Sequence, residues 1–145
     1  MQKIKLLTVG KLKEKYLEDA MEEYAKRLSR FCKFTVVELA EKRSLIEESE
    51  AILKECKGIV VAFAIEGEAL SSEQFADKLK IYKDSGQEVT FVIGSSYGLA
   101  NIVKERANAL ISLSKMTFPH QLARLLCTEQ IYRAFMINTG ATYHK

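Results

Sequence analysis

Short apolar runs recur along the chain and are separated by segments in which apolar residues repeat at helical spacing. Runs of this length, rich in Ile, Val and Phe, are typical of β-strands. Strands are therefore expected at residues 4–9, 34–39, 59–65, 89–93 and, more weakly, 110–113. Strands that alternate with helices predict an α/β fold, with a largely parallel sheet covered by helices.

Capping signals bracket two of the expected helices. Ser44 with Glu47, and Ser71 with Gln74, have the spacing of capping boxes. Gly58 and Gly86 stand where the carboxyl ends of the same helices are expected. Helices are thus predicted near residues 45–56 and 72–85.

Two segments have more apolar surface than one helix or one strand face needs. The run at 59–65 is apolar at every position, which predicts a central strand buried on both faces. The last helix is expected from Pro119 or Gln121 to about Asn138, before Gly140, and apolar residues surround much of it. A second copy of the protein could supply the missing cover, so a homodimer through this helix is expected.

Length and composition favour one domain spanning residues 1–145, with 48% hydrophobic and 28% charged residues. No apolar run approaches the roughly 18–20 residues of a membrane span, and the amino terminus lacks a signal-peptide core, so a cytoplasmic protein without membrane contact is expected.

Cys32, Cys56 and Cys127 are widely spaced and only two histidines are present, which predicts free thiols and no metal site.

Basic residues concentrate toward the two ends of the chain, although the net charge is only +3. Residues 1–38 hold nine Lys and Arg against six Asp and Glu, and residues 101–145 hold six against two. The middle is acidic, with seven against eleven. Such ends could attract a polyanion such as RNA, although a solvated surface explains mild segregation equally well.

Residues 94–98 read Gly-Ser-Ser-Tyr-Gly and follow a strand, which matches the G-x-S-x-G nucleophile elbow of serine hydrolases. A triad built on Ser96 would need an acid and then a histidine, and no Asp follows Asp84. A glycine turn beside a ligand pocket is the favoured interpretation. Neither G-x-G-x-x-G nor a Walker lysine is present, which leaves open ligands such as S-adenosylmethionine that carry no phosphate.

Charged and aromatic residues of the last helix and tail are candidates for chemistry. His120 and Arg124 are four residues apart and share a helix face, whereas Arg133 points to the opposite side. A salt bridge with Glu129 is the simplest role for Arg133, although it could also complete a partner's site. The tail of residues 143–145 (Tyr, His, Lys) is either a frayed end or a set of groups that holds a base and its phosphate.

Several segments together resemble one known family. They read FVIGSSYG at 91–98, SLSKMTFPHQLARLL at 112–126, EQIYRA at 129–134 and YHK at the end, together with KIKLLTVGKLKEKYLEDAMEEYAKRL at 3–28. The chain is similar over most of its length to the RlmH family, small SPOUT-class enzymes that methylate N3 of a pseudouridine in large-subunit ribosomal RNA. The block around SKMTFPHQ is highly specific.

The resemblance implies a carboxy-terminal trefoil knot, S-adenosylmethionine as cofactor and a homodimer with sites at its interface. It departs at two positions, because the family usually has a second glycine where Ser95 stands and often has leucine at 63. By matching motif, the resemblance assigns the cofactor to Phe63, Gly94, Leu113, Ser114, Lys115, Met116, Thr117 and Phe118.

For mechanism, the resemblance implies attack of a base nitrogen on the sulfonium methyl, without a metal. N3 is a weak acid, so a base or a cation near it should help. The assembled ribosome is the expected substrate, and Arg124 is expected to be structural or to contact phosphate. A non-catalytic module that binds the ribosome or RNA is the alternative. The residues expected to position the base and neutralise charge are His120, Arg133, Tyr143, His144 and Lys145.

Overall fold

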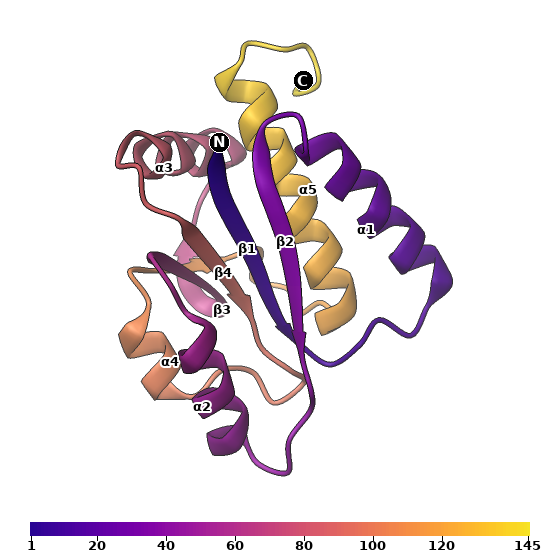
Figure 1. The fold of residues 1–145 in the computed structure, drawn as a ribbon, viewed down its shortest axis with the longest axis vertical. Helices are drawn as coiled ribbons and strands as arrows, with labels where there is room; N and C mark the ends of the chain where they lie inside the picture. Colours follow the sequence, from indigo (N-terminus) through magenta and orange to yellow (C-terminus); the bar gives the residue numbers. More distant parts are fainter.

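A computed structural model describes residues 1–145. Strands and helices alternate along the whole chain, as the sequence predicts, and the expected strands and helices all form (Figure 1). The elements are β1 (Gln2–Val9), α1 (Lys15–Leu28), β2 (Cys32–Leu39), α2 (Leu45–Glu55), β3 (Ile59–Ala69), α3 (Ser72–Asp84), β4 (Val89–Ile93), α4 (Asn101–Arg106), β5 (Ala109–Ser112) and α5 (His120–Asn138).

The five strands form one sheet in the order β2-β1-β4-β3-β5, and every pair is parallel. The expectation of a largely parallel sheet is confirmed. The expectation that the apolar run at 59–65 is the central strand is wrong, because β4 occupies the middle and β3 lies beside it. All five residues of β4 are buried, as a strand with neighbours on both edges and helices on both faces requires.

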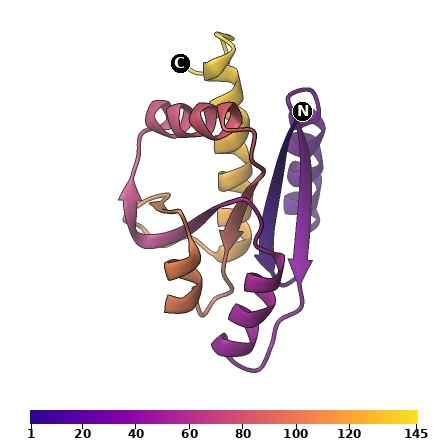
Figure 2. The same cartoon turned by 60° about the vertical axis from the view of Figure 1, so that its left-hand side comes forward.

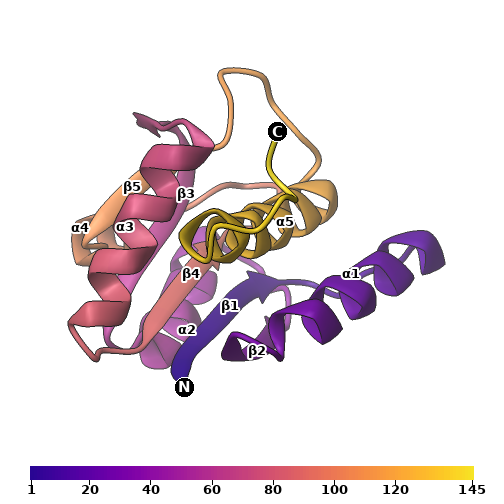
Figure 3. The same ribbon diagram turned by 90° about the horizontal axis from the view of Figure 1, so that it is seen from above.

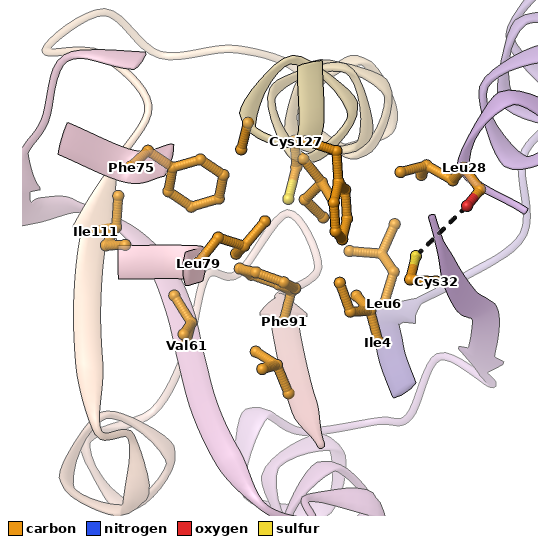
Figure 4. Packing of buried hydrophobic residues seen from close by; sticks show 14 of the residues in the cluster. Ile4, Leu6, Leu28, Cys32, Val61, Phe75, Leu79, Phe91, Ile111 and Cys127 are labelled. Carbon is orange, nitrogen blue, oxygen red and sulfur yellow. Dashed lines mark hydrogen bonds between the residues drawn. The ribbon is translucent and has the colours of Figure 1, made fainter. Parts of the chain in front are cut away.

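Helices cover both faces of the sheet. Figure 3 shows α3, α5 and α1 side by side along one face, and α2 and α4 lie on the other. Successive residues of β1 divide between the two layers: Ile4 and Leu6 pack into the larger core, and Leu7 and Val9 into the smaller one. The larger core centres on Phe91 of β4, beneath Cys127 of α5 (Figure 4).

The last helix, α5, lies between α3 and α1 (Figure 3). These two helices cover it on two sides, and the sheet covers the side that faces the strands. This arrangement accounts for much of the apolar surface that seemed to lack cover in the sequence. The side that faces away from the sheet carries Leu122, Leu126, Glu129 and Arg133, all of intermediate exposure. We call these four residues the outward strip of α5.

The strand β3 bends partway along its length (Figure 2), and its pairing with β4 ends at Ala62. Its pairing with β5 shifts register between Phe63 and Glu68, so one strand has extra residues that the other does not match. Ile65 lies in this bend and is 55% exposed, which is why the apolar pattern of the run overstated its burial.

The capping signals form with one difference. Ser71 and Gln74 make both hydrogen bonds of a capping box at the start of α3. At α2 only half forms, because Ser44 accepts from the Glu47 amide without the reciprocal bond. Gly58 and Gly86 have φ of 66° and 76°, the left-handed conformation expected where these helices end.

The three cysteines are free thiols, as expected. Burial raises the pKa of Cys32 to about 12, so this thiol stays protonated and unreactive at neutral pH. No group of three or more His, Cys, Asp or Glu side chains is placed to hold a metal ion. No helix combines the length and the apolar character needed to span a membrane.

Candidate active site

A cavity of about 630 Å³ opens where the ends of β3, β4 and β5 meet the start of α5. This is the position at which parallel α/β sheets commonly bind ligands, because loops after the strands converge there. Its size lies within the usual range for small-molecule sites. It is lined by Phe63, Ala64, Ile65, Glu66, Ile93, Gly94, Ser95, Ser96, Gly98, Leu99, Lys104, Ser112, Leu113, Ser114, Met116, Thr117, Phe118, Pro119, His120 and Ala123.

Seven of the eight residues that the resemblance assigns to the cofactor line this one cavity: Phe63, Gly94 and all of residues 113–118 except Lys115. They come from segments as much as 55 positions apart in the chain. Lys115 belongs to the same loop, but its side chain is exposed and does not line the cavity.

Gly94 directly follows β4 and forms part of the cavity wall. A Cβ at this position would lie 2.3 Å from the carbonyl oxygen of Gly98, closer than any real side chain approaches. The chain folds back over Gly94 in a turn whose Gly98 amide donates to the Ser95 carbonyl oxygen at 2.9 Å. Only glycine leaves room for this turn, and the resulting wall is made largely of backbone.

Ser95 stands where the family usually has glycine, and the structure shows how it is accommodated. No residue other than glycine has a positive φ, so Ser95 adds no backbone strain. Its hydroxyl donates to Glu48 Oε1 of α2 at 2.7 Å, and both side chains are buried. The hydrogen bond of Ser95 therefore ties the turn to α2.

The loop of residues 113–119 closes one side of the cavity. The Ser112 hydroxyl donates to the Ser114 carbonyl oxygen at 2.9 Å, and the Ser114 hydroxyl accepts from the Met116 amide at 3.0 Å. Pro119 precedes the first residue of α5, and its carbonyl oxygen accepts from the Ala123 amide. These bonds hold the loop without regular secondary structure.

An ion pair that no sequence motif indicated lies at the same cavity. Lys104 of α4 pairs with Glu66 of the bent part of β3, and both residues line the cavity. The hydrogen bond from Lys104 lowers the pKa of the Glu66 carboxyl. Sequence alone could not find the pair, because the bend of β3 brings its members together.

His120 and Arg124 do not act together, contrary to what their spacing suggested. His120 lines the cavity. Arg124 is only 1% exposed, forms an ion pair with Glu38, and donates from Nη2 to the Gly10 carbonyl oxygen at 3.0 Å. It joins α5 to the ends of β1 and β2, so the structural role considered for Arg124 is confirmed.

The carboxy-terminal tail folds back onto α5 instead of fraying. Tyr143 donates to Glu129 Oε2 at 3.0 Å, and the guanidinium of Arg133 lies 4.8 Å from the centre of the Tyr143 ring. The salt bridge expected between Glu129 and Arg133 is present at 3.1 Å. Burial, together with hydrogen bonds to Tyr24 and Glu129, raises the pKa of Tyr143, so its phenol stays protonated here.

His144 connects the tail to two helices. Its Nδ1 lies 3.0 Å from Arg133 Nη1, and its Nε2 lies 2.6 Å from Glu73 Oε1 at the start of α3. Because a guanidinium can only donate, Nδ1 accepts and Nε2 carries the proton. The hydrogen bond from His144 lowers the pKa of Glu73.

The tail and Arg133 do not line the cavity of their own chain. His120 begins α5 at the cavity, and the tail follows the other end of this 19-residue helix (Figure 1). Arg133 lies 13 residues after His120, roughly 20 Å along the helix, and the tail folds back beside Glu129 and Arg133. Of the five residues expected to act on the base, only His120 shares a cavity with the cofactor positions.

The geometry gives no support to a hydrolase built on Ser96. A nucleophile elbow is a strained turn, and Ser96 does not have a positive φ. Its side chain is exposed and makes no hydrogen bond to His120, although both line the cavity.

Comparison with known proteins gives the cavity a context. Residues 2–144 match the family model described as "Predicted SPOUT methyltransferase". The chain belongs to the SPOUT methyltransferase family. Membership accounts for the parallel sheet and implies the carboxy-terminal trefoil knot that the resemblance led us to expect.

Two curated relatives of this SPOUT methyltransferase are each named Ribosomal RNA large subunit methyltransferase H. The protein from Streptococcus pyogenes is 47% identical and the one from Streptococcus thermophilus 49% identical, each over 99% of both chains. A solved structure, the SpoU methyltransferase AviRb from Streptomyces viridochromogenes in complex with the cofactor AdoMet, is 13% identical with a TM-score of 0.53. That match covers 97% of this chain and 59% of the other, and it shows likeness of fold alone.

S-adenosylmethionine suits the cavity of this SPOUT methyltransferase. Phe63, Leu113 and Phe118 provide apolar walls, and the turn over Gly94 brings backbone close to the cavity. A cofactor made of a nucleoside and an amino acid is held by such contacts and needs no metal. Glu66 and Lys104 add one charge of each sign at the rim.

Proposed function

We propose that this protein transfers a methyl group from S-adenosylmethionine to N3 of a pseudouridine in large-subunit ribosomal RNA. The observation that carries the proposal is the assembly of one cavity from Phe63, Gly94 and the loop 113–119, all within a SPOUT methyltransferase. The names of near full-length relatives support the RNA as substrate. The position and the nucleoside rest on the resemblance of the SKMTFPHQ block.

The cofactor would be held by residues of the cavity wall. Gly94 and the loop from Leu113 to Phe118 offer backbone donors and acceptors, and Phe63 offers an apolar surface. When bound, S-adenosylmethionine supplies a methyl group that its sulfonium makes electrophilic. The protein's task is then to orient the base, exclude water and manage the proton of N3.

His120 is the residue best placed to act on that proton. It begins α5 and lines the cavity, where its imidazole can accept a proton or donate a hydrogen bond to a uracil carbonyl. Loss of the N3 proton leaves a negative charge on the base, and a nearby cation lowers the cost of that charge. Lys104 is the cation that lines the same cavity, although Glu66 already engages it.

A homodimer would bring the remaining expected residues to a site. Arg133 lies 13 residues after His120, roughly 20 Å along α5, and neither it nor the tail lines the cavity of its own chain, so these residues would act in the cavity of a partner copy. Half of the outward strip is apolar, namely Leu122 and Leu126. A partner that packs on this strip would cover it and bring its own tail near the cavity.

The substrate is proposed to be the assembled ribosome, because one small cavity and a short tail give little surface for recognising a long RNA. Equal activity on protein-free RNA would refute this part.

The deciding experiment is transfer of labelled methyl from S-adenosylmethionine to ribosomes isolated from cells that lack this protein, followed by mapping of the labelled nucleoside. Label on one pseudouridine of the large-subunit RNA is expected. His120→Ala should lose transfer while it still binds the cofactor in calorimetry, and Ser96→Ala should keep most transfer. Absence of both label and cofactor binding would instead favour a non-catalytic RNA-binding protein.

A further inference from the structure

Tyr97 is an aromatic side chain displayed at the rim of the cavity without a partner in the protein. It is 67% exposed, and its neighbours Ser96 and Gly98 both line the cavity. Its hydroxyl makes no hydrogen bond, and its ring packs against no other aromatic ring. Nothing in the catalytic proposal above uses it.

The turn that carries Tyr97 is held by several hydrogen bonds. The Tyr97 amide donates to Ser95 Oγ at 3.2 Å, and the same hydroxyl donates to Glu48 Oε1 at 2.7 Å. Glu48 is 2% exposed and its other carboxylate oxygen accepts from the Lys42 amide at 3.4 Å. The Gly98 amide closes the turn, so the backbone under the Tyr97 ring is fixed from three directions.

A fixed and exposed ring beside a nucleic-acid site has one favourable use. Burying an aromatic face against a base releases water from both surfaces, and every base offers such a face. Little ordering cost opposes the contact, because the backbone is already held and the ring has only two side-chain torsions. By contrast, leaving such a ring in water brings no benefit to the folded protein.

The chemistry of the substrate creates the need for such a contact. N3 lies on the Watson–Crick edge of the base, so the target must be unpaired and turned out of its stack before its N3 can reach the cavity. The nucleotide beside it then loses its stacking neighbour. Lys115 stands exposed on the adjoining loop, where its charge suits the phosphates of the same strand.

We propose that Tyr97 stacks on a base that neighbours the methylated nucleotide, and that Ser95 and Glu48 hold it in place for this purpose. The proposal rests on ribosomal RNA being the substrate and goes beyond it in naming the residue that contacts the flanking base. Tyr97 touches the RNA and not the cofactor, so it affects substrate recognition alone.

Steady-state kinetics on ribosomes lacking the modification test the stacking. Tyr97→Ala should lower kcat/KM for ribosomes by roughly 5- to 150-fold, the usual effect of removing one stacked ring. Tyr97→Phe should stay within about threefold of wild type, because stacking uses the ring and not the hydroxyl. Calorimetric affinity for S-adenosylmethionine should be unchanged in both variants.

A photocrosslinking experiment identifies what the ring touches. Benzoylphenylalanine is placed at position 97 in one protein and, as a control, at position 81 in another. Ile81 is 65% exposed on α3, remote from the cavity, so it matches Tyr97 in exposure alone. The probe at 97 should crosslink to large-subunit RNA within a few nucleotides of the methylated base, and the probe at 81 should not.

Different failures have different meanings. Wild-type protein that does not methylate ribosomal RNA would refute the proposed function itself. Normal methylation by wild type with an undiminished kcat/KM for Tyr97→Ala would overturn the stacking proposal and leave the function intact. Crosslinks from position 97 to a second copy of the chain or to a ribosomal protein would also overturn it.

Discussion

Replacing Gly94 with alanine tests whether the turn after β4 forms the cofactor site. The added Cβ would lie 2.3 Å from the Gly98 carbonyl oxygen, whereas ordinary contact begins at 3.4 Å, so the turn has to retreat by about 1 Å. Overpacking of this kind costs about 1–3 kcal/mol of folding free energy. For a chain of this size the unfolding midpoint should fall by roughly 2–12 °C.

The same displacement should weaken cofactor binding. If the retreat removes one or two backbone hydrogen bonds to the cofactor, at about 0.5–1.5 kcal/mol each, the dissociation constant rises by roughly 2- to 150-fold. Methyl transfer should fall further, on the order of 10²-fold, because a shift of about 1 Å misaligns the reacting groups. Isothermal calorimetry with S-adenosylmethionine and a thermal unfolding scan measure the two effects separately.

Gly86→Ala is the matched control. Gly86 has φ of 76°, and a Cβ added there would meet nothing within 4 Å, so alanine adds backbone strain without a clash. Strain of about 1–2 kcal/mol should lower stability by an amount similar to that of Gly94→Ala. Cofactor affinity of Gly86→Ala should equal that of wild type. If Gly94→Ala also binds the cofactor as wild type does, the turn is not part of the site.

Four further outcomes are expected. Leu126→Glu should yield monomers in sedimentation and abolish methyl transfer, and a fully active monomer would refute the shared site. A charge at Ile131 is no equivalent test, because this core residue is 0% exposed and its replacement would unfold the protein. Deletion of residues 143–145 should spare cofactor binding and cripple transfer, so undiminished turnover would exclude a role for the tail. Because His144 lowers the pKa of Glu73, their contact stabilises the fold above the ordinary carboxyl pKa, and this stabilisation is lost as the pH falls through the lowered pKa. In Glu73→Gln, the unfolding midpoint should no longer show this contribution to its fall at acid pH. Arg124→Met should lower stability by about 2–3 kcal/mol in denaturant titration, less than for a fully buried pair because the partner carboxylate is partly hydrated.

Local patterns in the sequence predicted the elements well, because each strand and helix is specified by its own residues. The Ser71 capping box and the runs at 4–9 and 89–93 are examples. Strand order was beyond this reasoning, since nothing in the apolar run at 59–65 shows which neighbours it pairs with. The prediction that Ile65 is buried was wrong for the same reason, because the bend of β3 depends on its pairing with β5.

In the candidate site, too, local features could be predicted from the sequence and contacts between distant segments could not. The turn at Gly94 was found because its glycines mark a turn after a strand, and the loop of residues 113–118 was assigned by the family resemblance; both line the cavity. The pair of Glu66 and Lys104 was missed, since the two residues meet only when β3 bends toward α4. Spacing along a helix also misled, because His120 and Arg124 share a face in sequence while the ends of β1 and β2 draw the arginine into the core.

The position of α5 sets the order in which the chain can finish folding. This helix follows every other element described, yet it fills the middle of its layer between α1 and α3. Until residues 120–138 are available, the apolar side of β1 and β4 faces solvent and Arg124 cannot join the strand ends. Contacts between such distant parts of a chain form slowly, and an incomplete chain exposes surface that favours aggregation. Synthesis of the final helix therefore completes the core and the cavity in the same event.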